Sequence, residues 1–218
     1  MNHEPVLVVG ASRGIGAELV RQYLAEGHPV HATVRDRAAP GELAGLAGDL
    51  AVHVLDVRDG DQTAELARGL GGTDLGIVIH NAGIRRGVSR EEIMDVNAVA
   101  PIRVVEALLD AGAVVSGGVV AIMTSQMGAR RGSTHRLGDY GESKAALNEE
   151  FRRRADNWAR RGVVAIVVHP GWVRTDMGGA FATLGVTESV TAMRKLIDGL
   201  TEDHHGRFWT WDGREHPW

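Results

Sequence analysis

The chain has 218 residues, of which 44% are hydrophobic and 24% charged, with a formal net charge of −4. This acidic balance argues against a protein that binds nucleic acid, and the absence of cysteine excludes disulfides and thiolate catalysis. The length predicts one domain that spans residues 1–218 and buries a sizeable core.

The N-terminal segment enters a strand pattern at once, without the basic region and the apolar region of a signal peptide. No apolar run approaches the ~20 residues that a membrane span needs. We therefore expect a soluble, cytoplasmic protein that does not act at a membrane.

Short apolar runs alternate with helical patterns along the chain. Strands buried on both faces are predicted at Val6–Val9, Val30–Val34, Val52–Leu55, Leu75–Ile79, Val119–Met123 and Val163–Val168, with an aromatic edge strand at Arg207–Trp211. Helices are predicted at Gly14–Glu26, Asp61–Leu70, Arg90–Asp110, Gly138–Arg161 and Thr187–Leu200. This alternation predicts an α/β fold of the Rossmann type: a doubly wound parallel sheet of about seven strands with helices on both faces.

A glycine-rich turn joins the first strand to the first helix. Gly10 allows the tight turn, Gly14 lets the backbone approach a pyrophosphate, and Gly16 lets the helix pack closely against the strand. Free N–H groups at the helix start favour an anion at this place. The turn therefore predicts a dinucleotide site, to which we assign the neighbouring residues Ser12, Arg13 and Ile15.

The end of the second strand bears on the choice of cofactor. A carboxylate there would favour NAD, but Val34 occupies the position and Arg35 follows it. With Arg13 in the glycine turn, Arg35 could clamp a ribose 2′-phosphate, which favours NADPH over NADH. Two alternatives stay open: both arginines are solvated surface residues, or Asp36 supplies the acid in a register shifted by one or two residues.

Tyr140 and Lys144 are four residues apart and therefore share one face of a helix. A nearby ammonium stabilises tyrosinate and lowers the tyrosine pKa from its reference value of ~10, which suits proton transfer near neutral pH. Alone, this spacing is typical of an ordinary helix surface contact. Its position between the strand that leads to Ser125 and the strand that leads to Pro170 favours a catalytic pair.

With these motifs in order, the sequence resembles the short-chain dehydrogenase/reductase family from its first strand to its C-terminus. The residues that carry the resemblance are Gly10, Gly14, Gly16, Asp56, Val57, Asn81, Ala82, Gly83, Asn97, Ser125, Tyr140, Lys144, Pro170 and Gly171. The segments Thr175–Gly179 and Gly206–Trp218 are similar to the C-factor and Sniffer-like carbonyl reductase branch. The resemblance implies an enzyme that reduces a carbonyl with NADPH, or oxidises the alcohol in reverse.

The resemblance also implies a role for each catalytic residue. Tyr140 would donate the proton, and Lys144 would hold the nicotinamide ribose and lower the pKa of Tyr140. Ser125 would polarise the carbonyl, and Asn97 would hold a water that links Lys144 to solvent. The cofactor contacts implied are Asp56 and Val57 at the adenine, Asn81, Ala82 and Gly83 on the adenosine side, and Pro170, Gly171, Val173 and Thr175 at the nicotinamide.

Further expectations concern partners. A small carbonyl or alcohol compound is the expected substrate, and the family implies a homo-oligomer, a dimer or a tetramer. No metal site is expected, because neither CxxC nor HExxH spacing occurs. The basic segment with Arg130, Arg131, His135 and Arg136 either attracts an acidic substrate or is merely solvated. The rival function is a catalytically idle NADP-binding sensor of the same fold, against which the complete catalytic set weighs.

Overall fold

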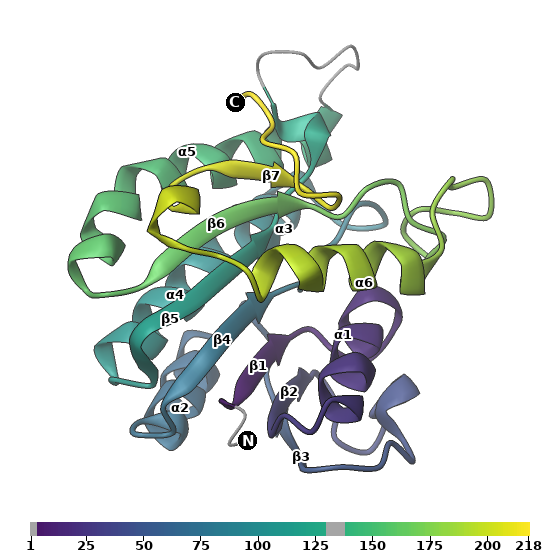
Figure 1. Ribbon diagram of the computed structural model, residues 1–218. Helices are drawn as coiled ribbons and strands as arrows, with labels where there is room; N and C mark the ends of the chain where they lie inside the picture. The colour runs from purple at the N-terminus through teal and green to yellow at the C-terminus, as the bar shows by residue number, and fades with distance from the viewer. Residues whose placement is uncertain (1–3, 130–137) are drawn as a thin grey trace.

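A computed structural model describes residues 4–129 and 138–218. Seven strands form one parallel sheet in the order β3-β2-β1-β4-β5-β6-β7 (Figure 1). The strands are β1 (Val6–Val9), β2 (Val30–Val34), β3 (Leu50–Val54), β4 (Leu75–His80), β5 (Val114–Met123), β6 (Val164–His169) and β7 (Phe208–Thr210). This order reverses direction between β1 and β4, as in dinucleotide-binding sheets, so the predicted fold class is confirmed.

Helices cover both faces of the sheet. On one face pack α2 (Gly60–Leu70), α4 (Ala100–Asp110) and α5 (Gly138–Arg160), and on the other α1 (Gly14–Ala25) and α6 (Val186–Ile197). Successive residues of β1 enter alternate cores: Leu7 packs under α2, α4 and α5, whereas Val8 packs under α1 and α6. Because both faces of β1 are buried, this strand is apolar at every position rather than at every second one. β3 lies at the edge of the sheet and is only partly buried, so its predicted burial on both faces is wrong.

Two elements differ from the sequence prediction. β5 begins at Val114 instead of Val119, because a register irregularity and a left-handed Gly117 (φ +85°) let a polar, glycine-containing stretch join the sheet. The predicted helix over 90–110 contains a π turn at Asp95–Val99, which separates α3 (Arg90–Met94) from α4. Such turns occur often at functional sites.

Shorter elements complete the chain. Single-turn 3₁₀ helices lie at Gly41–Leu43, Gln126–Gly128 and Glu202–His204. Over the described ranges, 4–129 and 138–218, no helix combines the length and the apolar character needed to cross a bilayer.

Candidate active site

A cleft of about 670 Å³ runs along the carboxyl ends of the strands. Its volume is within the range of small-molecule sites, and its place beside the reversal of strand order is where such sheets bind ligands. The predicted site residues in its lining are Gly10, Ser12, Arg13, Gly14, Ile15, Arg35, Asp56, Val57, Asn81, Ala82, Gly83, Tyr140, Lys144, Pro170 and Thr175. The predicted residues outside its lining are Gly16, Asn97, Ser125, Gly171 and Val173.

The glycine turn is fixed against β2 and β4. Gly10 has φ +82°, and a Cβ there would lie 2.7 Å from the Cα of Ala82. Its N–H donates to Thr33 Oγ1 (3.0 Å), and its carbonyl accepts from Asn81 Nδ2 (2.7 Å). A Cβ on Gly16 would overlap the Gly10 carbonyl oxygen. Both positions therefore require glycine, because the surrounding backbone packs too closely for a side chain, and such a tight turn is typical of a pyrophosphate site.

The rim of this turn already shows affinity for an anion. The N–H of Gly14, at the start of α1, donates to the carboxylate of Glu42 (3.0 Å). Arg13 pairs with Asp176 (3.1 Å) across the mouth of the cleft, and Arg35 lines the same end. Backbone N–H groups and two guanidiniums at one end suit the phosphates of a dinucleotide.

Asp36 does not support the alternative of a ribose-binding acid. Its Oδ1 accepts from the N–H of Ala38 (2.8 Å), which closes a turn, and the residue is not part of the cleft lining. Arg35 is therefore the charged residue that the end of β2 presents to the cleft.

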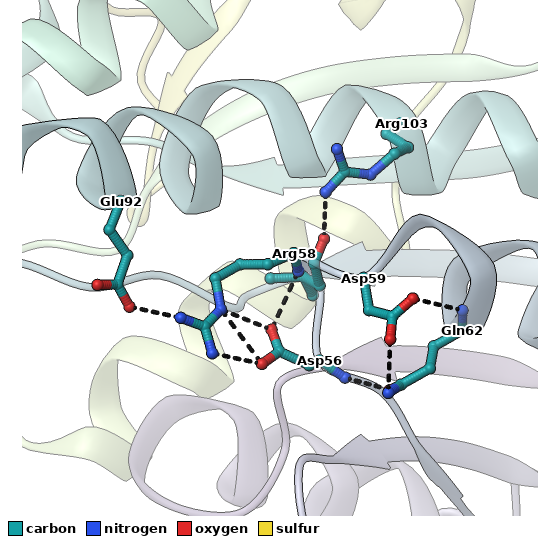
Figure 2. Close-up of polar contacts among 7 residues, drawn as sticks. Asp56, Arg58, Asp59, Gln62, Glu92 and Arg103 are labelled. Atoms are coloured by element: carbon teal, nitrogen blue, oxygen red, sulfur yellow. Dashed lines mark hydrogen bonds and ion pairs between the residues drawn. The ribbon is translucent and has the colours of Figure 1, made fainter.

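Asp56 is engaged by a neighbouring arginine (Figure 2). Arg58 donates to both Asp56 oxygens, at 2.6 and 3.0 Å, and reaches Glu92 in α3 at 2.7 Å. Hydrogen bonding from Arg58 holds the Asp56 pKa below its usual value. The Asp56 N–H donates to Gln62 (2.8 Å), which in turn bonds Asp59 at the start of α2. This network fixes the loop after β3.

Val57, the next residue, is tied to α4. Its carbonyl accepts from Arg103 (2.5 Å), so that oxygen already has a protein donor. An adenine that contacts Asp56 or Val57 would therefore share these residues with Arg58 and Arg103, which already bond them.

Ser125, Tyr140 and Lys144 converge at the other end of the cleft. Ser125 follows β5 and is buried, and its side chain lies close enough to the Tyr140 hydroxyl in α5 to favour the ionised phenol and lower its pKa. Its Oγ also accepts from the N–H of Met127 (3.1 Å). Lys144 lies one helical turn beyond Tyr140 and donates to the carbonyl of Met123 (2.9 Å). The structure therefore brings the predicted hydroxyl, phenol and ammonium together.

The titration of Tyr140 differs from the prediction. Burial raises its pKa above the usual value, opposed first by the positive charge of Arg85 and then by the Ser125 hydrogen bond. Arg85 is therefore the cation that most favours the ionised phenol here, and the role of Lys144 in lowering this pKa stays a prediction. The Arg85 Cζ lies 5.7 Å from the Tyr140 ring centroid, and Lys144 Nζ lies 6.0 Å from it.

Lys144 is itself strongly perturbed. Its side chain is buried, and desolvation lowers its pKa to about 7. At neutral pH the group is therefore divided between ammonium and amine, which suits a residue that exchanges protons.

Asn97 lies in the π turn and is buried. Its Nδ2 donates to the Ile84 carbonyl (2.7 Å) and to Ser143 Oγ (3.0 Å), while its Oδ1 accepts from the Ile84 N–H (2.9 Å). Ser143 donates to the Tyr140 carbonyl (2.7 Å). Asn97 thus joins the loop after β4 to α5, and its role in holding a water stays a prediction.

The loop after β6 carries the remaining predicted contacts. Pro170 accepts from Ser189 in α6 (2.6 Å), and Gly171 has φ +86° with no room for a Cβ beside Leu184. Val173 is buried. Thr175 faces Gly14, since a Cβ on that glycine would lie 3.3 Å from the threonine methyl. This loop therefore lies opposite the glycine turn, across the cleft.

Sequence reasoning missed Arg85 and Glu42. Arg85 lies two residues after the predicted cofactor-binding segment Asn81–Gly83. A basic residue at this position is a sequence signal for a site residue. Glu42 lies far along the chain from the glycine turn, and nothing local marked it. The basic residues Arg130, Arg131, His135 and Arg136 lie outside the described residues. In the described part of the chain, no group of three or more His, Asp or Glu side chains could hold a metal.

Comparison with known proteins identifies the family. Residues 4–183 match the family model described as short chain dehydrogenase. The chain belongs to the short-chain dehydrogenase family. This dehydrogenase is an oxidoreductase by that membership, and it is 42% identical over 124 residues to the C-signal protein of Myxococcus xanthus, an alignment covering 56% of this chain and 75% of that protein.

Two solved structures extend the likeness over the whole dehydrogenase. The NADPH-bound carbonyl reductase from chicken fatty liver is 29% identical, with a TM-score of 0.87 and complete coverage of both chains. The carbonyl reductase Sniffer of D. melanogaster is 26% identical, with a TM-score of 0.88 and complete coverage of both chains. The resemblance to the C-factor and Sniffer-like branch is thereby confirmed.

Proposed function

We propose that this dehydrogenase reduces the carbonyl of a small molecule with NADPH, and that Tyr140 supplies the proton. The observation that carries the proposal is the convergence of three groups: Tyr140 and buried Lys144 line the cleft one helical turn apart, and the buried Ser125 side chain interacts with Tyr140. Two neighbouring hydroxyls can both donate to one substrate oxygen, which is the arrangement that carbonyl polarisation needs.

Each residue has a defined part in this reaction. The bound cofactor supplies the hydride, which goes to the carbonyl carbon. Ser125 donates a hydrogen bond to the carbonyl oxygen, and Tyr140 transfers its phenolic proton to that oxygen as charge develops there. The tyrosinate left behind is stabilised by the positive charges of Arg85 and Lys144 until solvent returns the proton.

The choice of NADPH rests on the adenosine end of the cleft. Arg35 and Arg13 line this end together with Arg58, which is paired with Asp56, whereas Asp36 is not part of the lining. The carbonyl reductase from chicken fatty liver was crystallised with NADPH. We also infer that residues 1–218 act as one domain, since both helical layers pack on one sheet.

The test is cofactor oxidation, followed by absorbance, with NADPH and NADH against a panel of aldehydes, ketones and quinones. We expect turnover with at least one carbonyl class and a higher kcat/KM with NADPH. Tight NADPH binding without turnover across the panel would contradict the proposal and favour a cofactor-binding sensor.

A further inference from the structure

Arg85 lies beside the proposed catalytic tyrosine without belonging to the catalytic set. It is located in the loop after β4, directly after Ile84, whose N–H and carbonyl are both bonded to the Asn97 side chain (2.9 and 2.7 Å). These bonds fix the backbone next to Arg85. The backbone from which the Arg85 side chain extends is therefore held by the fold and does not belong to a freely moving loop.

The guanidinium of Arg85 is placed between two walls of the cleft. Its Cζ lies 5.7 Å from the Tyr140 ring centroid, and its Nη1 is 3.5 Å from the carbonyl of Met177, in the loop after β6. Tyr140 and Met177 both line the cleft, whereas Arg85 is not part of that lining. The guanidinium therefore lies next to the wall of the cleft, at the place where a carbonyl would reach Tyr140.

Arg85 also lacks a carboxylate partner among the described residues. Other arginines around it have one: Arg58 pairs with Asp56 and Arg90 with Glu142. Arg85 is partly buried, and within residues 4–129 and 138–218 its one protein acceptor is a carbonyl at the outer limit of hydrogen bonding. A partly desolvated guanidinium with donors to spare is suited to bind a carboxylate from outside the chain.

We propose that Arg85 is a specificity-determining residue that binds the carboxylate of an anionic carbonyl substrate beside Tyr140. The assignment rests on the proposed reductase function and names its substrate class: oxo acids and aldehyde or ketone carboxylates. Arg85 acts by binding and positioning the substrate, because a guanidinium keeps its proton near neutral pH and therefore does not act as an acid or a base.

The test compares matched substrates that differ by one negative charge. Benzoylformate, 3-carboxybenzaldehyde and 4-carboxybenzaldehyde place the carboxylate at three distances from the carbonyl, and each is paired with its methyl ester. Arg85→Met, Arg85→Lys and the neighbouring exposed Arg86→Met are compared with the wild type. We expect the acid-to-ester ratio of kcat/KM to fall about tenfold or more in Arg85→Met for at least one pair, as loss of a charge-assisted hydrogen bond implies.

Arg85→Lys should keep part of the acid-to-ester ratio of kcat/KM, and Arg86→Met should keep all of it. An acid-to-ester ratio that is unchanged in Arg85→Met for all three pairs would overturn the inference, even if the turnover of this variant falls for acids and esters alike.

A second measurement does not depend on turnover. It is the calorimetric binding of benzoate and of benzamide to the NADPH-saturated enzyme. We expect benzoate affinity alone to depend on Arg85, and equal losses for both compounds would again overturn the inference. If no carbonyl is reduced but benzoate binding still depends on Arg85, the reductase proposal fails and the carboxylate site stands.

Discussion

At the scale of single residues, the buried Lys144 lowers the free energy of unfolding of the protein. Lys144 is buried, its pKa is lowered to about 7 by desolvation, and its Nζ donates to a single backbone carbonyl. We infer that an ammonium in such a place serves the proposed chemistry, since an apolar side chain of similar length would pack there with less penalty.

Lys144→Met should therefore stabilise the protein while removing its activity. We expect the free energy of unfolding without cofactor to rise by about 1 kcal/mol or more at pH 6–7. Lys144 has a pKa of about 7 in the folded protein and of about 10 in the unfolded chain. Below pH 7 the folded protein therefore bears the full free-energy cost of a buried ammonium. It fades as the pH rises toward 10, and the gain from the mutation should fade with it.

Urea unfolding of both proteins at pH 6.5 and pH 9.5 checks this result. The exposed Lys195→Met in α6 serves as the control, with a change within about 0.5 kcal/mol at either pH. A destabilised Lys144→Met protein at pH 6.5 would show that the ammonium contributes to folding.

At the scale of elements, the π turn between α3 and α4 fixes two parts of the site relative to each other. It directs Asn97 into the protein, where three hydrogen bonds join the loop after β4 to α5. Through this residue, the helix that carries Tyr140 and the loop that carries Arg85 are held in register.

Asn97→Ala should loosen that connection. We expect a loss of about 2–3 kcal/mol in the free energy of unfolding, because buried partners lose their bonds, and a fall in kcat of about 10- to 100-fold through misplacement. The exposed Asn157→Ala in α5 is the matched control. If Asn97→Ala keeps full kcat despite the lower stability, the residue serves folding alone.

At the scale of the whole molecule, the sequence alone predicts the sheet, the helices and nearly half of the cleft lining. It does so because a strand buried on both faces is apolar throughout, and because the glycine turn and the Tyr140–Lys144 pair are local patterns. The contacts of Arg85 with Tyr140 and of Glu42 with Gly14 join distant segments, so a local pattern can mark a residue such as Arg85 but cannot identify its partner. The start of β5 was missed because Gly117 interrupts the apolar run that marks a strand.

Cofactor binding should stabilise the molecule as a whole. At a concentration of 100 times its Kd, NADPH should add about 2.7 kcal/mol, or a rise in Tm of roughly 5–10 °C for a chain of this size. NADH at the same concentration should raise Tm less. Arg35→Ser should reduce the NADPH shift and leave the NADH shift in place, while Arg37→Ser, outside the cleft lining, should change neither. Equal wild-type shifts for the two cofactors would contradict the assignment of Arg35 to the 2′-phosphate.

The measurement that tests the central claim most directly is the NADPH-dependent reduction of the best carbonyl substrate by Tyr140→Phe, alongside the Kd of the same protein for NADPH. The account predicts that kcat/KM falls at least about 100-fold, because the proton donor is lost, while the Kd stays within about threefold of the wild type. A Tyr140→Phe protein that binds NADPH and reduces the carbonyl at the wild-type rate would contradict it.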